Sequence, residues 1–162
     1  MILSLIFFAC NSKKSKKETE TGKFSFHEVS NLVNLNFLHE PGVDSSYYMP
    51  ESIGSGCAFL NYDNDGDLDI YMVNGNQHNA KSPTDTFTTN RLFLQNDYGK
   101  FSDVTETSGL GDSGYGMGVA VGDINNDGYV DVYITNYGFD ALYRNNGDGT
   151  FRDGAEALRL AK

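Results

Sequence analysis

Basic residues are scarce in this chain of 162 residues, which has 12 Lys and Arg against 22 Asp and Glu and a net charge of −10. Nucleic acids and anionic membrane surfaces reward Lys and Arg, so this balance argues against both as partners. Proline is rare, with three residues. Before the last dozen residues, apolar residues do not recur with the helical period of 3.6 residues over any long stretch, so no helix is expected in that part of the chain. The surface is instead suited to gathering cations.

Cysteine is also rare, and the two residues do not suggest a disulfide framework. Cys57, in the apolar run "GCAFL", is predicted to be a small core residue. Cys10 ends "MILSLIFFAC", which is too short to span a bilayer but resembles a bacterial lipoprotein signal. This predicts export, lipidation at Cys10 and anchoring at the outer membrane or cell surface, with no other membrane contact. An ordinary cleaved export signal is the alternative, and residues 11–22 are expected to be a flexible tether.

An internal repeat organises the rest of the chain, residues 23–162. The stretch "GSGCAFLNYDNDGDLDIYMVNG" (54–75) aligns with "GMGVAVGDINNDGYVDVYITNY" (116–137). Further on, "RLFLQNDYGKFSDVTETSGL" (91–110) aligns with "ALYRNNGDGTFRDGAEALRL" (141–160). The chain therefore holds two similar units, at about 54–110 and 116–160.

Each unit contains four short runs rich in Val, Ile, Tyr and Phe, separated by turn residues. Four-stranded antiparallel units at this spacing are typical of β-propeller blades, so an all-β, incomplete propeller of about two blades is predicted. "FSFHEVS" (24–30) is expected to add one lone strand. The small residues Gly54, Gly56, Gly116, Gly118 and Ala120 fit crowded inner strands. Because two blades cannot close a ring, the chain is expected to be the N-terminal piece of a longer protein.

The most informative feature is an acidic loop, present once in each unit. Hard cations such as Ca²⁺ take six to eight oxygen ligands, and alternating Asp and Asn can supply them around a bend at Gly. The candidate ligands are Asn61, Asp63, Asp65, Asp67 through its carbonyl and Asp69 in one loop, and Asp123, Asn125, Asp127, Tyr129 through its carbonyl and Asp131 in the other. Two Ca²⁺ sites are therefore predicted. Asx turns without metal are the alternative.

Other motifs carry weaker signals. An EF-hand needs Glu at position 12 of the loop, which here is Met72 or Ile134. "NNGDGTF" (145–151) is expected to be a plain hairpin turn. "GDSGYG" lacks the partners that would make Ser113 a nucleophile. His27, His39 and His78 do not have the spacing of zinc ligands. The polar insert 77–89 is expected to be a surface loop, and it is the first candidate for contact with a ligand.

The loops and their Gly-rich lead-in strands resemble the FG-GAP/VCBS repeat family, whose blades carry D-x-D-x-D-G-x-x-D. The segments "FHEVS", "NFLHEPG", "MPESIGSGCAFLNYDNDGDLDIYMVNGN" and "LYRNNGDGTFRD" are most similar to bacterial relatives of cartilage acidic protein that have a C-terminal ASPIC/UnbV domain. The resemblance implies a calcium-loaded propeller, exported or cell-attached. This chain departs from the pattern at Asn61, and it contains no ASPIC/UnbV segment.

Two functions follow. The first is a non-catalytic module that binds an extracellular protein or glycan through loops that calcium rigidifies. The second is an accessory propeller of a larger polysaccharide-degrading or other extracellular enzyme. No nucleophile–base pair is identifiable in the sequence, which favours the first function.

Overall fold

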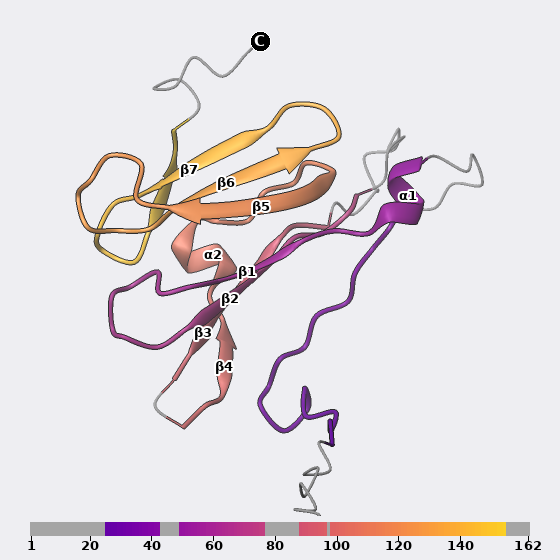
Figure 1. Ribbon diagram of the computed structural model, residues 1–162, viewed down its shortest axis with the longest axis horizontal. Helices are drawn as coiled ribbons and strands as arrows, with labels where there is room; N and C mark the ends of the chain where they lie inside the picture. Colours follow the sequence, from indigo (N-terminus) through magenta and orange to yellow (C-terminus); the bar gives the residue numbers. More distant parts are fainter. Residues whose placement is uncertain (1–24, 43–48, 77–87, 97, 155–162) are drawn as a thin grey trace, which may run out of the picture.

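The computed structural model describes residues 25–42, 49–76, 88–96 and 98–154. The regular elements within these residues are two four-stranded antiparallel sheets and two short helices (Figure 1). The first sheet consists of β1 (Cys57–Leu60), β2 (Asp69–Met72), β3 (Arg91–Gln95) and β4 (Phe101–Asp103). The second consists of β5 (Gly116–Gly122), β6 (Asp131–Asn136), β7 (Ala141–Asn145) and β8 (Phe151–Asp153). Helix α1 spans Met49–Ile53 and α2 spans Thr105–Ser108.

Both sheets have the same meander topology, with strand orders β1-β2-β3-β4 and β5-β6-β7-β8. Their first hairpins also close at equivalent positions, since Leu60 lies opposite Asp69 and Gly122 lies opposite Asp131. The acidic loops are thus the β1–β2 and β5–β6 connections. This repetition confirms the predicted all-β architecture of two four-stranded blades, which form an open arc and not a closed ring.

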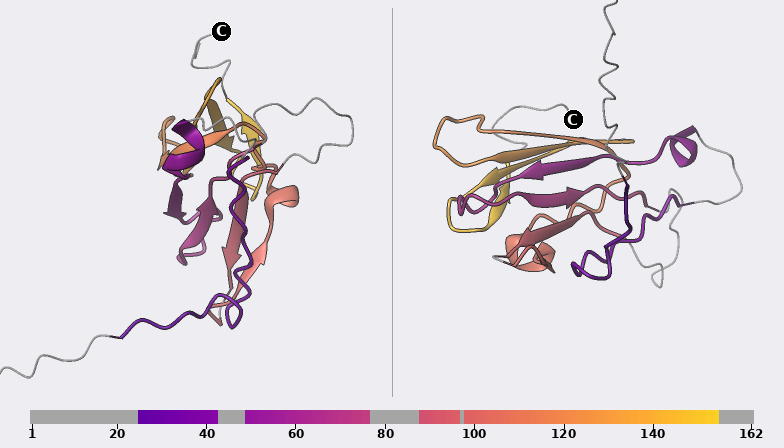
Figure 2. Two further views of the ribbon diagram at one scale, coloured as in Figure 1. Left: turned by 90° about the vertical axis from the view of Figure 1, so that its right-hand side faces the viewer. Right: turned by 60° about the horizontal axis from the view of Figure 1, so that its bottom comes forward.

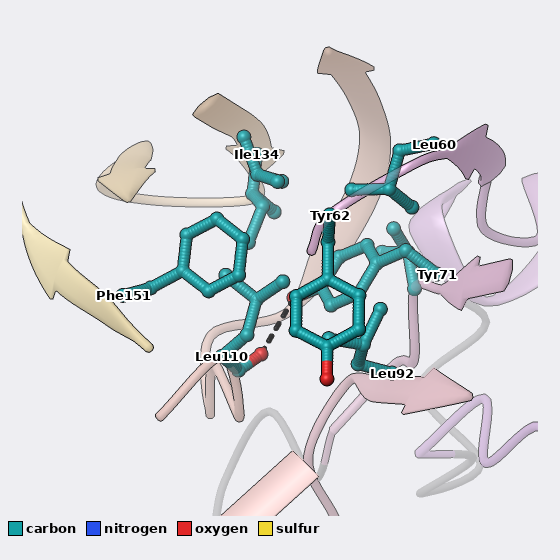
Figure 3. Packing of buried hydrophobic residues seen from close by; sticks show 9 residues of the cluster. Leu60, Tyr62, Tyr71, Leu92, Leu110, Ile134 and Phe151 are labelled. Atoms are coloured by element: carbon teal, nitrogen blue, oxygen red, sulfur yellow. Dashed lines mark hydrogen bonds between the residues drawn. The ribbon is translucent and has the colours of Figure 1, made fainter. Parts of the chain in front are cut away.

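The hydrophobic core lies between the two sheets (Figure 3). The first sheet contributes Leu60, Tyr71 and Leu92, and the second contributes Val132 and Ile134. Val132 and Ile134 alternate along β6 and therefore point to the same side of the sheet, as the period of a strand requires. Each is fully buried, so truncating Ile134 to Ala costs about 2–5 kcal/mol. The two blades consequently stabilise each other.

The first strands of the two sheets approach closely at some of the small residues that predicted crowding, but not at Gly54, which precedes β1 and whose added Cβ would meet nothing within 4 Å. A Cβ added to Gly56 would lie 3.2 Å from the Cα of Gly118 across the gap between the sheets. A Cβ on Gly116 would overlap the side chain of Val73 and lie 2.8 Å from the carbonyl oxygen of Asn74. Glycine is required at these positions because backbone and side chains of the other sheet fill the space that a side chain would need.

The lone strand predicted over residues 24–30 is not formed. Residues 25–29 have no regular structure, and the side chain of Phe26 is 99% exposed. The segment joins the first blade only further along, where the Phe101 amide donates to the Val33 carbonyl (2.7 Å) and the Glu40 amide donates to the Asn74 side chain (2.8 Å). A fourth strand needs the third strand of its own sheet as a neighbour, and the described residues place none beside 25–29.

Two further expectations were wrong. Cys57 is exposed, because side chains alternate along β1: Leu60 faces the second sheet, whereas Cys57 and Phe59, which is 62% exposed, face the opposite side. Helices also form before the last dozen residues. Helix α2 begins at Thr105, whose amide donates to Asp103 (3.0 Å), and ends at Ser108, after which Gly109 caps it with φ of 73°. A turn fixed by such local capping is too short for a periodic signal.

None of the helices in the described part of the chain has the length and apolar character needed to cross a bilayer. Cys10, the tether 11–22, His78 and most of the insert 77–89 lie outside the described residues.

Candidate metal centre

The two acidic loops lie side by side at one edge of the molecule. Both project from the ends of the first hairpins on the same side (at the left in Figure 1, and again in the right-hand view of Figure 2). A hydrogen bond joins them directly, from the side-chain amide of Asn64 in the first loop to the carbonyl of Gly128 in the second (3.0 Å). The blade packing therefore brings together two loops that are separated by about sixty residues in the sequence.

Both loops bend through the same backbone conformations. Asn64 and Asn126 have φ of 62° and 59°, and Gly66 and Gly128 have φ of 101° and 89°. Asn tolerates the left-handed region better than other residues with a side chain, and Gly adopts it without steric cost. The Asn-x-Gly spacing thus sets two successive bends in each loop and folds the intervening acidic residues back on themselves.

The ninth-position carboxylates, Asp69 and Asp131, form the base of the loops. Asp69 accepts the amides of Tyr62 (3.0 Å) and Gln95 (2.9 Å), one oxygen each. Asp131 accepts the amides of Ile124 (3.0 Å) and Asn145 (2.8 Å) in the same arrangement.

Asp69 and Asp131 occupy equivalent positions in their blades, and each connects its loop to the third strand of its sheet, β3 or β7. Both are buried. Burial raises the pKa of Asp69 above its ordinary value although its two amide bonds act to lower it.

The tip of the second loop is held by its own amides. Asp123 accepts the amides of Asp127 (3.1 Å) and Gly128 (2.8 Å), and the Gly128 bond in particular holds the pKa of Asp123 below its ordinary value. The Asn125 side chain donates to Asp127 (2.6 Å), and Asp127 accepts the Tyr129 amide (3.0 Å). All of these donors and acceptors belong to the loop, so the exposed tip is shaped mainly by its own residues, and Asn64 of the first loop adds one contact from outside, to the Gly128 carbonyl.

The tip of the first loop is built similarly, but one of its buried polar atoms lacks a hydrogen-bond partner. Asp63 accepts the Asp65 amide (3.3 Å), and Asp65 accepts the Asp67 amide (2.9 Å). Burial raises the pKa of Asp63, and the neighbouring charge of Asp65 raises it further. The side-chain oxygen of Asn61 is buried and has no hydrogen-bond partner. A buried acceptor without a partner is costly, so this oxygen is free to bind a ligand.

The donor set suits a hard cation. Every predicted ligand atom in both loops is an oxygen, the ligand type of Ca²⁺ and Mg²⁺, and the unpartnered Asn61 oxygen lies at the first ligand position. The carboxylates alone do not form a cage: within the described ranges, no group of three or more His, Cys, Asp or Glu side chains is placed to hold a metal ion. A bound cation would therefore need amide and carbonyl oxygens together with the carboxylates.

The structure also shows where the other sequence motifs lie. Met72 and Ile134 lie in strands β2 and β6, so the loops connect strands and are not EF-hands. Residues 146–150 form the turn between β7 and β8, where the Asn146 amide donates to the Thr150 carbonyl (2.9 Å), as predicted. Ser113 lies in the loop that enters β5, where its carbonyl accepts the side-chain amide of Asn76 (2.7 Å).

Two residues that link the loops, Asn64 and Asn145, were missed by the sequence reasoning. Asn145 ends β7, and its side chain crosses to the first loop, where it donates to the Tyr62 carbonyl (2.7 Å). The available signal was the polar pair Asn145–Asn146 directly after the apolar residues of β7. A sequence alone does not tell such a pair from ordinary turn residues.

Comparison with protein families gives one match, to the FG-GAP-like repeat, over residues 61–134 and again over 123–160. Comparison with curated proteins gives no match. The two matched segments together span most of the described blades and include both acidic loops. They overlap over residues 123–134, at the second loop. The chain belongs to the FG-GAP-like repeat family.

Proposed function

We propose that this chain is a calcium-binding module of an exported protein that binds a protein or glycan partner and does no catalysis itself. The observation that carries the calcium assignment is the buried, unpartnered oxygen of Asn61 at the head of a loop with four Asp residues. A cation would satisfy that oxygen and neutralise the carboxylates around it. Calcium fits better than magnesium, because flexible loops with many oxygens suit its larger and more variable coordination shell.

Electrostatics supports a cation in both loops. Two carboxylates about 4 Å apart repel by roughly 4 kcal/mol at an effective dielectric constant of 20, and less where water screens them. The first loop has carboxylates at Asp63, Asp65, Asp67 and Asp69, and the second at Asp123, Asp127 and Asp131. A divalent ion turns this repulsion into attraction, and the loop that holds it becomes more rigid.

Recognition of a partner is assigned to the edge where the loops meet. Loops held by a rigid scaffold are common binding surfaces, and two ions would fix both loops in one arrangement. Kinship with the ASPIC/UnbV-containing relatives of cartilage acidic protein is part of the proposal, as is a lipid anchor at Cys10. Mass spectrometry of the cell-envelope form would detect a diacylglyceryl or triacyl modification at Cys10, and an unmodified N-terminus would contradict the anchor.

Thermal unfolding of the full chain in CaCl₂ and in EGTA tests the calcium assignment. A ligand that binds only the folded state at 100 times its Kd stabilises by about 2.7 kcal/mol, which corresponds to a rise in Tm of several degrees for a domain of this size. Asp127→Ala should reduce this calcium-dependent rise. Asp148→Ala is the matched control, because it removes one exposed carboxylate from the β7–β8 turn, outside both loops. Equal Tm values in CaCl₂ and EGTA would refute calcium binding.

A further inference from the structure

The two acidic loops are connected by more than proximity. On the surface, the Asn64 side chain of the first loop donates to the Gly128 carbonyl of the second (3.0 Å). Gly128 in turn donates its amide to Asp123 (2.8 Å), a predicted ligand. Movement of one loop tip therefore changes a contact that positions a ligand in the other.

A second connection runs through the interior. The Tyr62 amide donates to Asp69 (3.0 Å), and the Tyr62 carbonyl accepts the side-chain amide of Asn145 (2.7 Å). The backbone amide of Asn145 donates to Asp131 (2.8 Å). This row joins the base carboxylates of the two loops through two residues. Its members are 0%, 7%, 3% and 1% exposed, from Asp69 to Asp131, so water does not compete for these bonds.

The equivalent positions in the other blade make no such connection. Asn126 has the backbone conformation of Asn64, and among the described residues its side chain makes no hydrogen bond across to the first loop. Gln95 is the counterpart of Asn145 and binds Asp69 through its backbone amide, but its side chain makes no hydrogen bond to the second sheet in the described part of the chain. Asn64 and Asn145 therefore have matched controls within the chain.

We propose that the two loops bind calcium as one coupled unit, in which an ion in either loop raises the affinity of the other. This inference rests on the proposed calcium function. An ion in the first loop fixes Asp69 and the segment around Asn64, which holds the carbonyl of Tyr62 and the partner of Gly128 in place. The second ion then meets a loop that is already ordered and loses less conformational entropy on binding.

Charge opposes this coupling, because the first ion reduces the negative potential that attracts the second. This electrostatic effect acts through solvent and is screened by salt, whereas coupling through the hydrogen bonds between the loops is not screened. At about 0.5 M KCl the Debye length falls to roughly 4 Å. Titration at that salt concentration therefore isolates the coupling carried by Asn64 and Asn145.

Calorimetric titration of the full chain with CaCl₂ tests the proposal. Asp65→Ala disables the first loop and Asp127→Ala disables the second, which gives the affinity of each loop alone. The product of the two binding constants of the unmodified chain should exceed the product of these single-loop constants by about 5-fold or more. Asn64→Gly, which keeps the left-handed conformation, should reduce this factor to below about 2-fold, whereas Asn126→Gly should leave it unchanged.

Asn145→Ala should also reduce the factor, and Gln95→Ala should not, with circular dichroism confirming the fold of each variant. If two ions bind and the factor is 1 in the unmodified chain, the coupling is refuted while calcium binding stands. If Asn64→Gly and Asn126→Gly reduced the coupling factor equally, the proposal would also be refuted, because the contact between the loops would not be the cause of the coupling. If the chain takes up no calcium in any form, the proposed function itself fails.

Discussion

Removal of the Asp131 carboxylate should destabilise the protein strongly even when no calcium is present. This side chain is 1% exposed, and each of its oxygens accepts one backbone amide, from Ile124 and from Asn145. Asp131→Ala leaves the buried Asn145 amide without a partner, at about 1–3 kcal/mol, and the partly buried Ile124 amide, at about 1 kcal/mol. The expected loss is about 2–4 kcal/mol, against a typical net stability of 5–15 kcal/mol. Asp131→Asn keeps one acceptor and should fall between that variant and the unmodified chain.

The assay is thermal and urea unfolding of the full chain in EGTA, so that loss of a metal ligand cannot contribute. Asp127→Ala is the control because it removes one carboxylate from the same loop at an exposed position, where substitutions change stability by less than about 1 kcal/mol. The Tm of Asp131→Ala should lie at least about 5 °C below that of Asp127→Ala. Equal Tm values in EGTA would show that Asp131 does not tie β6 to its neighbours.

Two more outcomes are expected from the same measurements. Gly116→Ala should cost about 1–3 kcal/mol, because its Cβ meets Val73 and Asn74 of the other blade. Gly122→Ala, with open space around its Cβ in the same strand, should be neutral, and equal effects would contradict close packing of β5 against the residues that follow β2. Hydrogen bonds from the Tyr133 hydroxyl and, to a smaller extent, the Asn136 amide lower the pKa of Asp140. The unmodified chain should therefore have a higher Tm than Asp140→Asn. This difference in Tm should be full above pH about 4 and should shrink as the pH falls through the lowered pKa. A difference in Tm that is constant from pH 6 to 3 would argue against these bonds.

Much of the fold was readable because the repeat encodes it twice. The alternation of Val132 and Ile134 specifies a strand with one buried face, and the Gly at the sixth position of each loop specifies a bend, which Gly66 and Gly128 make with positive φ. These signals act over a few residues, so they survive without knowledge of the tertiary structure. The alignment of the two units then predicted that both loops would close at the same position of their hairpins, as Asp69 and Asp131 do.

The errors concern what each face of a strand meets. The run around Cys57 is apolar on both faces, and alternation cannot say which face the second blade covers; the structure gives that face to Leu60 and leaves Cys57 exposed. The segment around Phe26 has the composition of a strand but no third strand beside it. Pairing partners are a property of the whole fold, so a local pattern overestimates strand content wherever they are missing.

The sequence also treats the five ligand positions of each loop as equal, whereas the structure divides them in two. Asp131 is buried and is held by the Ile124 amide of the loop and by the Asn145 amide of β7, whereas Asp123 and Asp127 are exposed and are held by amides of the tip alone. Each carboxylate oxygen has two lone pairs, so an amide bond at Asp131 does not preclude binding a cation. The base of the loop is therefore already closed before an ion arrives, and most of the order that an ion adds falls on the tip. Loss of calcium binding on substitution at Asp131 reports a damaged fold as well as a missing ligand, and only tip variants measure the ligand contribution by itself.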